Sequence, residues 1–134
     1  MVNKNVGVGF GLVYVLVGVV GFFITGFSGF ASMNGETLLG FMLNPLHNVV
    51  HILVGALLIA GGLASVMISK RVNTTVGAVY FLVFAVGIAL QGSTANVLAL
   101  NWADDGLHLI SAVLLATVGL AADRSAGRPA YLSR

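Results

Sequence analysis

The sequence contains no cysteine and very little charge. The absence of cysteine excludes structural disulfides, iron–sulfur ligation and dithiol–disulfide chemistry. Only 7% of the 134 residues are charged, whereas 58% are hydrophobic and the mean hydropathy is +1.04. A soluble globular domain carries about 25% charged residues. The composition therefore excludes a soluble domain and indicates a membrane protein.

Four segments are apolar enough to cross a bilayer, which takes about 20 residues each. They cover residues 6–28, 46–68, 74–95 and 103–122 and leave no room for a soluble domain. We therefore predict a single all-α membrane domain, a bundle of four transmembrane helices. A cleaved signal peptide is not expected, because the first apolar run exceeds the about 7–15 residues of a signal-peptide core.

All six basic residues fall on one side of the predicted bundle. Lys4 precedes the first span, Lys70 and Arg71 lie in an expected tight turn at 70–73, and three arginines follow the fourth span. The positive-inside rule places this side in the cytoplasm, with both termini and a short polar tail over residues 123–134. The net charge of +2 reflects this bias, so nucleic-acid binding is not indicated.

The chain nearly repeats itself. Residues 11–26 and 77–92 are identical at eight of sixteen positions. Residues 44–64, NPLHNVVHILVGALLIAGGLA, likewise align with residues 101–121, NWADDGLHLISAVLLATVGLA. We interpret the chain as two copies of one helical hairpin.

The first hairpin repeat covers residues 6–68 and the second covers 74–122, in parallel orientation about a pseudo-two-fold axis along the membrane normal. The outer connection over residues 29–44 is longer than its counterpart and rich in apolar residues. We expect it to lie along the outer interface or to fold over the bundle.

Glycines recur on one face of the first and third spans, at spacings that share a helical face. Small residues let membrane helices approach closely, so we predict helix packing at Gly7, Gly11, Gly18, Gly21, Gly77 and Gly87.

The only concentrated chemistry lies near the outer ends of the second and fourth spans. The repeat aligns His51 with His108 and His47 with Asp104. His47 lies four residues before His51, and Asp104 lies four residues before His108. Residues four apart lie on one helical face. We predict that these four side chains form a shared cluster, with supporting polar residues at Asn44, Asn48 and Asp105.

Three interpretations of this cluster remain open. In the structural one, Asp104 or Asp105 accepts a hydrogen bond from a histidine and ties the hairpins together. In the second, His47, His51, Asp104 and His108 bind zinc, copper or iron. In the third, His51 and His108 are the axial ligands of haem b, although no basic residue lies on the outer side to meet the propionates.

The segment NPLHN at residues 44–48, followed by His51, resembles the hallmark of a bacterial family of small four-span membrane proteins that is frequent in actinobacteria. That family is catalogued only as a domain of unknown function. The resemblance covers nearly the whole chain and implies four spans in a bacterial plasma membrane. It implies no activity and no catalytic residues.

Two classes of function follow. We favour a non-catalytic accessory or interaction role, with membrane lipids, other membrane subunits or a second copy as partners. The alternative is a metal- or haem-binding protein for electron transfer, storage or sensing. A proton-coupled transporter is disfavoured because the middles of the spans carry no ionisable group. Catalysis is not indicated, although a metal with an open position could activate water.

Overall fold

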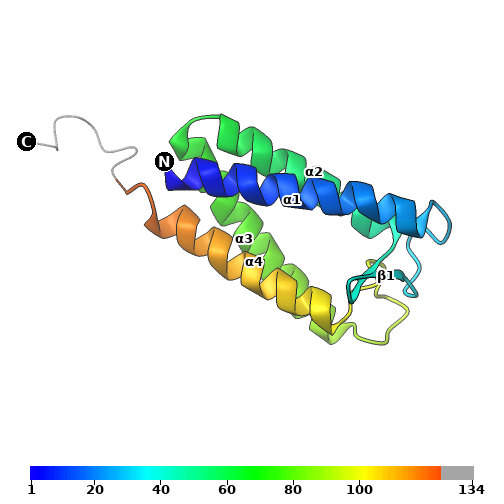
Figure 1. The fold of residues 1–134 in the computed structure, drawn as a ribbon. Helices are drawn as coiled ribbons and strands as arrows, with labels where there is room; N and C mark the ends of the chain where they lie inside the picture. Colours follow the sequence, from blue (N-terminus) through cyan, green and yellow to red (C-terminus); the bar gives the residue numbers. More distant parts are fainter. Residues whose placement is uncertain (125–134) are drawn as a thin grey trace, which may run out of the picture.

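The computed structural model describes residues 1–124 and confirms a mostly helical chain with four helices long and apolar enough to cross a membrane. These helices are α1 (Val2–Thr25), α2 (Pro45–Leu63), α3 (Val66–Ala89) and α4 (Trp102–Ala121). They run up and down, so that the N-terminus and the end of α4 lie at one end of the bundle (Figure 1). The predicted tail lies outside the described residues from residue 125 on.

Side-chain caps set the starts of three helices. Asn44 accepts a hydrogen bond from the backbone N–H of His47 at the start of α2, where Pro45 occupies the first turn. Ser65 caps α3, and Asn101 forms a capping box with Asp104 at the start of α4. Such caps satisfy backbone N–H groups that have no partner inside the helix.

The third span begins earlier than the sequence suggested. We expected a turn at residues 70–73, but α3 already starts at Val66, and Lys70 and Arg71 lie within its first turns. The prediction treated these charges as a boundary and overlooked the cap at Ser65. A lysine can remain in a helix near the membrane surface because its long stem reaches out to polar groups, and Lys70 donates to the backbone carbonyl of Ala122.

α1 packs against α2, and α3 packs against α4, through small residues. A Cβ added at Gly11 would lie 2.6 Å from the carbonyl oxygen of Gly55, and one added at Gly77 would lie 2.6 Å from the backbone nitrogen of Ala116. The other predicted packing glycines also have neighbours at their missing side chain: Gly7, Gly18, Gly21 and Gly87. The contacts of Gly11 and Gly77 fall at matching positions of the two hairpins, whose duplication stays a prediction.

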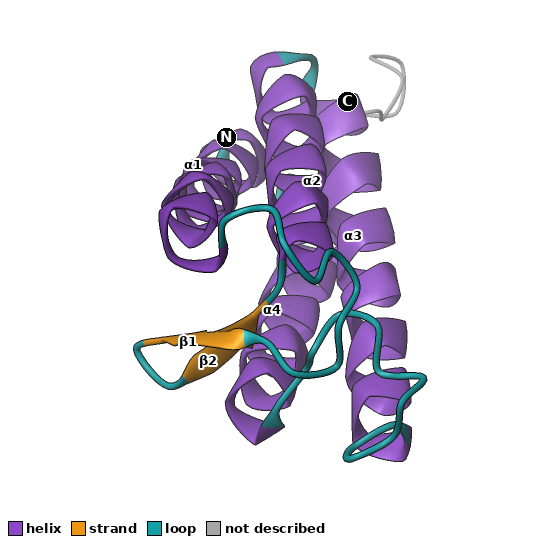
Figure 2. Cartoon of the chain, turned by 90° about the vertical axis from the view of Figure 1, so that its right-hand side faces the viewer, coloured by secondary structure: helices purple, strands orange, loops and turns teal. Residues whose placement is uncertain are grey.

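A short antiparallel β-hairpin interrupts the connection between α1 and α2. Strands β1 (Glu36–Leu38) and β2 (Phe41–Leu43) pair across a two-residue turn in which Leu39 and Gly40 both have positive φ. Two such residues in succession are typical of the turns that suit the twist of a hairpin. The strands and the loop between α3 and α4 gather at the end of the bundle opposite the N-terminus (Figures 1 and 2). The sequence prediction contained no strands here.

Candidate metal centre

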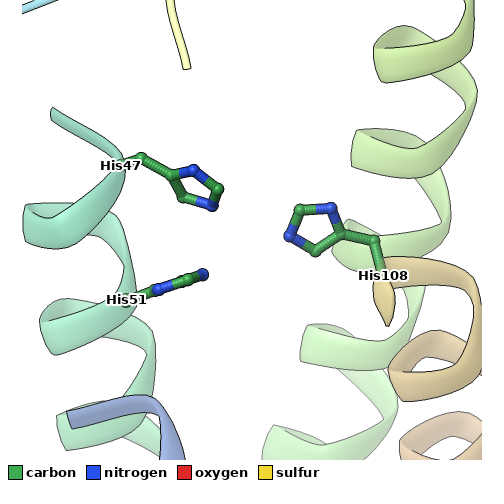
Figure 3. Close-up of side chains that lie close together, drawn as sticks. All are labelled: His47, His51 and His108. Atoms are coloured by element: carbon green, nitrogen blue, oxygen red, sulfur yellow. The ribbon is translucent and has the colours of Figure 1, made fainter. Parts of the chain in front are cut away.

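All three histidines of the chain meet between α2 and α4. His47 and His51 lie one turn apart on α2, and His108 points toward them from α4 (Figure 3). One possible ligand atom from each imidazole lies within 4.8 Å of the others. The structure thus brings together three of the four predicted metal ligands.

The histidine cluster is buried, and tyrosine rings form two of its walls. His47 is 1% exposed, and His51 and His108 are each 3% exposed. The ring of Tyr14 from α1 meets His51 edge-on at a centroid distance of 5.3 Å. Tyr80 from α3 contacts His108 at the same centroid distance. All four helices therefore contribute to the site.

One hydrogen bond defines the tautomer of His47. Its Nδ1 lies 3.2 Å from the backbone carbonyl oxygen of Met42 in β2. A carbonyl oxygen only accepts, so Nδ1 carries the proton and Nε2 keeps its lone pair. This Nε2 is buried and has no hydrogen-bond partner among the described residues. His47 is therefore held in the form that can bind a metal ion through Nε2.

Three more imidazole nitrogens are buried without a partner in the part of the chain that the structure describes. They are both ring nitrogens of His51 and Nδ1 of His108. Leaving a buried polar group unpaired costs about 1–3 kcal/mol. The structural interpretation required a hydrogen bond from a histidine to Asp104 or Asp105, and no such bond occurs within residues 1–124. The cluster therefore contains four buried imidazole nitrogens without a hydrogen-bond partner among residues 1–124, counting Nε2 of His47.

Asp104 does not belong to the group of three converging ligands. Its Oδ2 accepts hydrogen bonds from the backbone N–H groups of Met42 and Asn101, each at 3.0 Å. The carboxylate thus closes the capping box of α4 and also holds β2 in place. The structure thus places Asp104 beside the cluster and not among its converging ligand atoms.

Most of the chain matches one known protein family. Residues 4–121 match the family described as "Domain of unknown function (DUF4383)". The chain belongs to this family. No curated protein and no solved structure matches it.

In this DUF4383 protein the predicted supporting residues lie outside the histidine cluster. Asn48 donates from Nδ2 to the hydroxyl of Thr25, and Asp105 accepts from Nε2 of Gln91 at 2.6 Å. Each of these two hydrogen bonds lies within one helical hairpin. Gly21 lies beside Asn48, and Gly87 lies beside Asp105. Asn44 connects the α1–α2 loop to the α3–α4 loop, because its side-chain amide donates to the carbonyls of Ser32 and Val97. These residues therefore join the helices and loops that surround the histidine cluster.

Sequence reasoning missed two parts of the DUF4383 site. Met42 acts through its backbone, so its side chain carries no signal of that role. Tyr14 and Tyr80 did carry one, because the repeat aligns them just as it aligns His51 with His108. The sequence prediction, however, did not connect the two tyrosines to the histidines.

Proposed function

We propose that this DUF4383 protein binds a transition-metal ion through His47, His51 and His108. The observation that carries the proposal is the set of buried, unpaired imidazole nitrogens within 4.8 Å of one another. A protein that used these histidines only to join helices would pair them with acceptors. Neutral imidazole is a preferred ligand of zinc, copper, iron and nickel.

The spacing of the ligand atoms is close to that of a metal centre. In a tetrahedral zinc site with Zn–N bonds of about 2.0–2.1 Å, the ligand nitrogens lie about 3.3 Å apart. Closing the histidine cluster from its separation of at most 4.8 Å takes side-chain shifts on the order of 1 Å. Three protein ligands leave a fourth position open for water or another molecule.

The surroundings of His47 match those of metal-binding histidines in general. Such histidines donate their second ring N–H to a carbonyl or carboxylate, which fixes the ring and raises its basicity. His47 donates to Met42, whose backbone N–H in turn donates to Asp104. This link gives Asp104 the role of a positioning residue in the proposed centre.

The geometry favours a bare metal ion over haem. Haem b bound by His51 and His108 would place its macrocycle between these two rings. The ring of His47 lies 4.3 Å from that of His51 and 5.9 Å from that of His108, by centroid distance. It fills the space that the macrocycle would need.

The proposed setting is a bacterial plasma membrane, with both termini in the cytoplasm. Its support is the distribution of charge: Lys4, Lys70, Arg71 and Arg124 belong to the end of the bundle at which α1 begins and α4 ends. The histidine cluster then lies toward the outer face. Lipids, other membrane subunits or a second copy stay the proposed partners, because many large apolar side chains on the helices are exposed.

Metal analysis tests the proposal. The protein is purified in mild detergent with a tag that contains no histidine and without chelator, and its metal content is measured by mass spectrometry. We expect about one metal ion per chain, as one centre requires. We expect its loss in His51→Leu and His108→Leu. Tyr80→Phe is the matched control, because it keeps the ring beside His108 and removes no ligand.

A second measurement covers loss of metal during purification. Stripped protein is reloaded with cobalt(II), whose visible absorption reports tetrahedral nitrogen coordination. Binding that is equal in the wild type and both histidine variants, or no binding in any sample, would overturn the proposal. The non-catalytic accessory role would then be the better explanation of the fold.

A further inference from the structure

We infer that a groove between α1 and α4 binds a membrane-dissolved molecule that is apolar apart from an oxygen atom, which accepts a hydrogen bond from His51. The inference deepens the proposed function and rests on it, because it assigns the ring nitrogen of His51 that a metal ion leaves free. It also names a class of ligand, a lipophilic carbonyl compound.

The groove has a volume of about 490 Å³, within the roughly 300–1,000 Å³ of small-molecule sites. Its walls come mainly from apolar residues of α1, completed by α4 and by one imidazole of α2. Its lining includes Gly9, Phe10, Val13, Leu107, Ser111 and His51.

The mouth of the groove faces the lipid phase. Val13 and Leu107 line it and are 58% and 37% exposed, and Gly9 is exposed as well. These residues lie on two helices that are long and apolar enough to cross the membrane. A molecule in the bilayer can therefore enter sideways, and it needs an apolar body to match the walls.

Two polar groups lie on the inner side of this apolar groove. His51 lines it, and both of its ring nitrogens are buried without a partner among residues 1–124. Ser111 also lines it, and its hydroxyl oxygen lies 2.7 Å from that of Tyr14. This hydroxyl pair uses one of its two protons for the mutual bond and retains the other as a donor. Few polar groups within an apolar pocket are typical of ligand sites, where they orient the ligand.

The second ring nitrogen of His51 is the reason to expect an oxygen on the ligand, because this nitrogen needs a hydrogen-bond acceptor once the first one binds a metal ion. A metal-binding histidine donates its other N–H to an acceptor. His47 has such an acceptor in the carbonyl of Met42. His51 has none within the described residues, and it is His51 that lines the groove. A carbonyl oxygen on a lipophilic ligand supplies the missing acceptor.

The test compares two probes that share a tail. Binding of a decyl-substituted benzoquinone and of decylbenzene is measured by calorimetry in detergent micelles, on samples of known metal content. We expect saturable binding of the quinone, and roughly three- to tenfold weaker binding of decylbenzene, as one hydrogen bond implies.

Two glycine variants locate the site. A Cβ added at Gly9 meets nothing within 4 Å, and Gly9 lines the groove, so we expect Gly9→Leu to fill the groove without disturbing the helix backbone. Gly106→Leu is the matched control, because Gly106 is equally unobstructed but does not line the groove. We expect Gly9→Leu to weaken quinone binding about tenfold or more, and Gly106→Leu to leave it unchanged.

The outcomes separate the two proposals. Metal-loaded protein that binds no quinone, or that binds quinone equally in both glycine variants, would overturn the groove while the metal centre stands. Equal affinity for decylbenzene and the quinone would overturn the assigned oxygen. Quinone binding that Gly9→Leu weakens, in protein that takes up no metal, would support the groove and overturn the proposed metal centre.

Discussion

His47 and Asp104 are joined through the backbone of a single residue, Met42. The carbonyl of Met42 accepts from Nδ1 of His47, and its N–H donates to Oδ2 of Asp104. The β-hairpin thereby couples His47 on α2 to the start of α4. The connection between α1 and α2 therefore has a structural role, because its contact with Nδ1 sets which nitrogen of His47 faces the cluster.

Loss of the Asp104 carboxylate is expected to weaken metal binding without removing a ligand. Asp104→Ala frees the backbone of Met42 and loosens the ring of His47, so we expect a 10- to 100-fold lower affinity, as is usual when the groups behind metal ligands are changed. Loss of the hydrogen bond from the backbone N–H of Asn101 should also cost about 0.5–1.5 kcal/mol of stability. Competition with a chelator of known affinity measures the first effect.

Asp105→Asn is the control for that experiment. Asp105 is the neighbouring acid on α4, but its carboxylate accepts a hydrogen bond from Gln91 and none from the backbone of Met42 in the β-hairpin. An affinity loss as large in Asp105→Asn as in Asp104→Ala would contradict the positioning role of Asp104.

Replacing His51 by leucine is expected to stabilise the metal-free protein. The substitution removes two buried nitrogens that have no partner among residues 1–124, each of which costs about 1–3 kcal/mol when unpaired. Metal-loaded wild type should exceed its own metal-free form by about 2.7 kcal/mol at a metal concentration 100 times the Kd. Unfolding measured with and without chelator checks both expectations. A metal-free His51→Leu protein that is clearly less stable than metal-free wild type would indicate a structural histidine.

Close approach of α1 and α2 should make Gly11 intolerant of even one methyl group. The Cβ of Gly11→Ala would lie 2.6 Å from the carbonyl oxygen of Gly55. We expect destabilisation by about 1–3 kcal/mol, typical of overpacking. Gly9→Ala, two residues away on the same helix, meets nothing within 4 Å. It should be neutral or slightly stabilising, because alanine favours a helix over glycine by roughly 1 kcal/mol. Equal unfolding midpoints for the two variants would refute close helix packing at Gly11.

The pH dependence of stability should include a contribution from Asp123. Backbone N–H groups, first that of Asn3, donate to its carboxylate and hold the pKa of Asp123 below its usual value of about 3.8. The stabilisation is therefore fully present above the pKa of the unfolded chain and is lost as the pH falls through the lower folded pKa.

Asp123→Asn isolates that contribution, because asparagine also tolerates the positive φ of 51° at this position. We expect the stability difference between wild type and variant to shrink as thermal unfolding is measured at decreasing pH. A difference that stays constant from neutral to strongly acidic pH would argue against the contact.

The proposed orientation can be tested with introduced thiols, because the chain has no cysteine of its own. Leu39 is 90% exposed at the tip of the β-hairpin, and Ser65 lies in the turn between α2 and α3 at the other end. We expect a membrane-impermeant thiol reagent to label Leu39→Cys in intact cells, and to label Ser65→Cys only after the cells are opened. The reverse pattern would place the termini outside.

The sequence predicted four spans because hydropathy reports burial in lipid, whatever the neighbouring helices do. It located the span boundaries less well at α3, since the cap at Ser65 gave a weaker signal than the charges at Lys70 and Arg71. The β-hairpin also escaped prediction, because strands of three residues leave no usable periodicity.

For the candidate site, the sequence alone determined which residues carry the chemistry: His51 and His108 at matching places in a near-repeat, and His47 one helical turn before His51. It also determined that these lie near one end of the bundle, because helical spacing fixes depth. Only the tertiary structure decided that His47 joins the cluster whereas Asp104 bonds to the hairpin. This arrangement depends on how α2 and α4 are rotated about their axes and on contacts with the backbone of Met42. Neither can be predicted from the sequence of side chains.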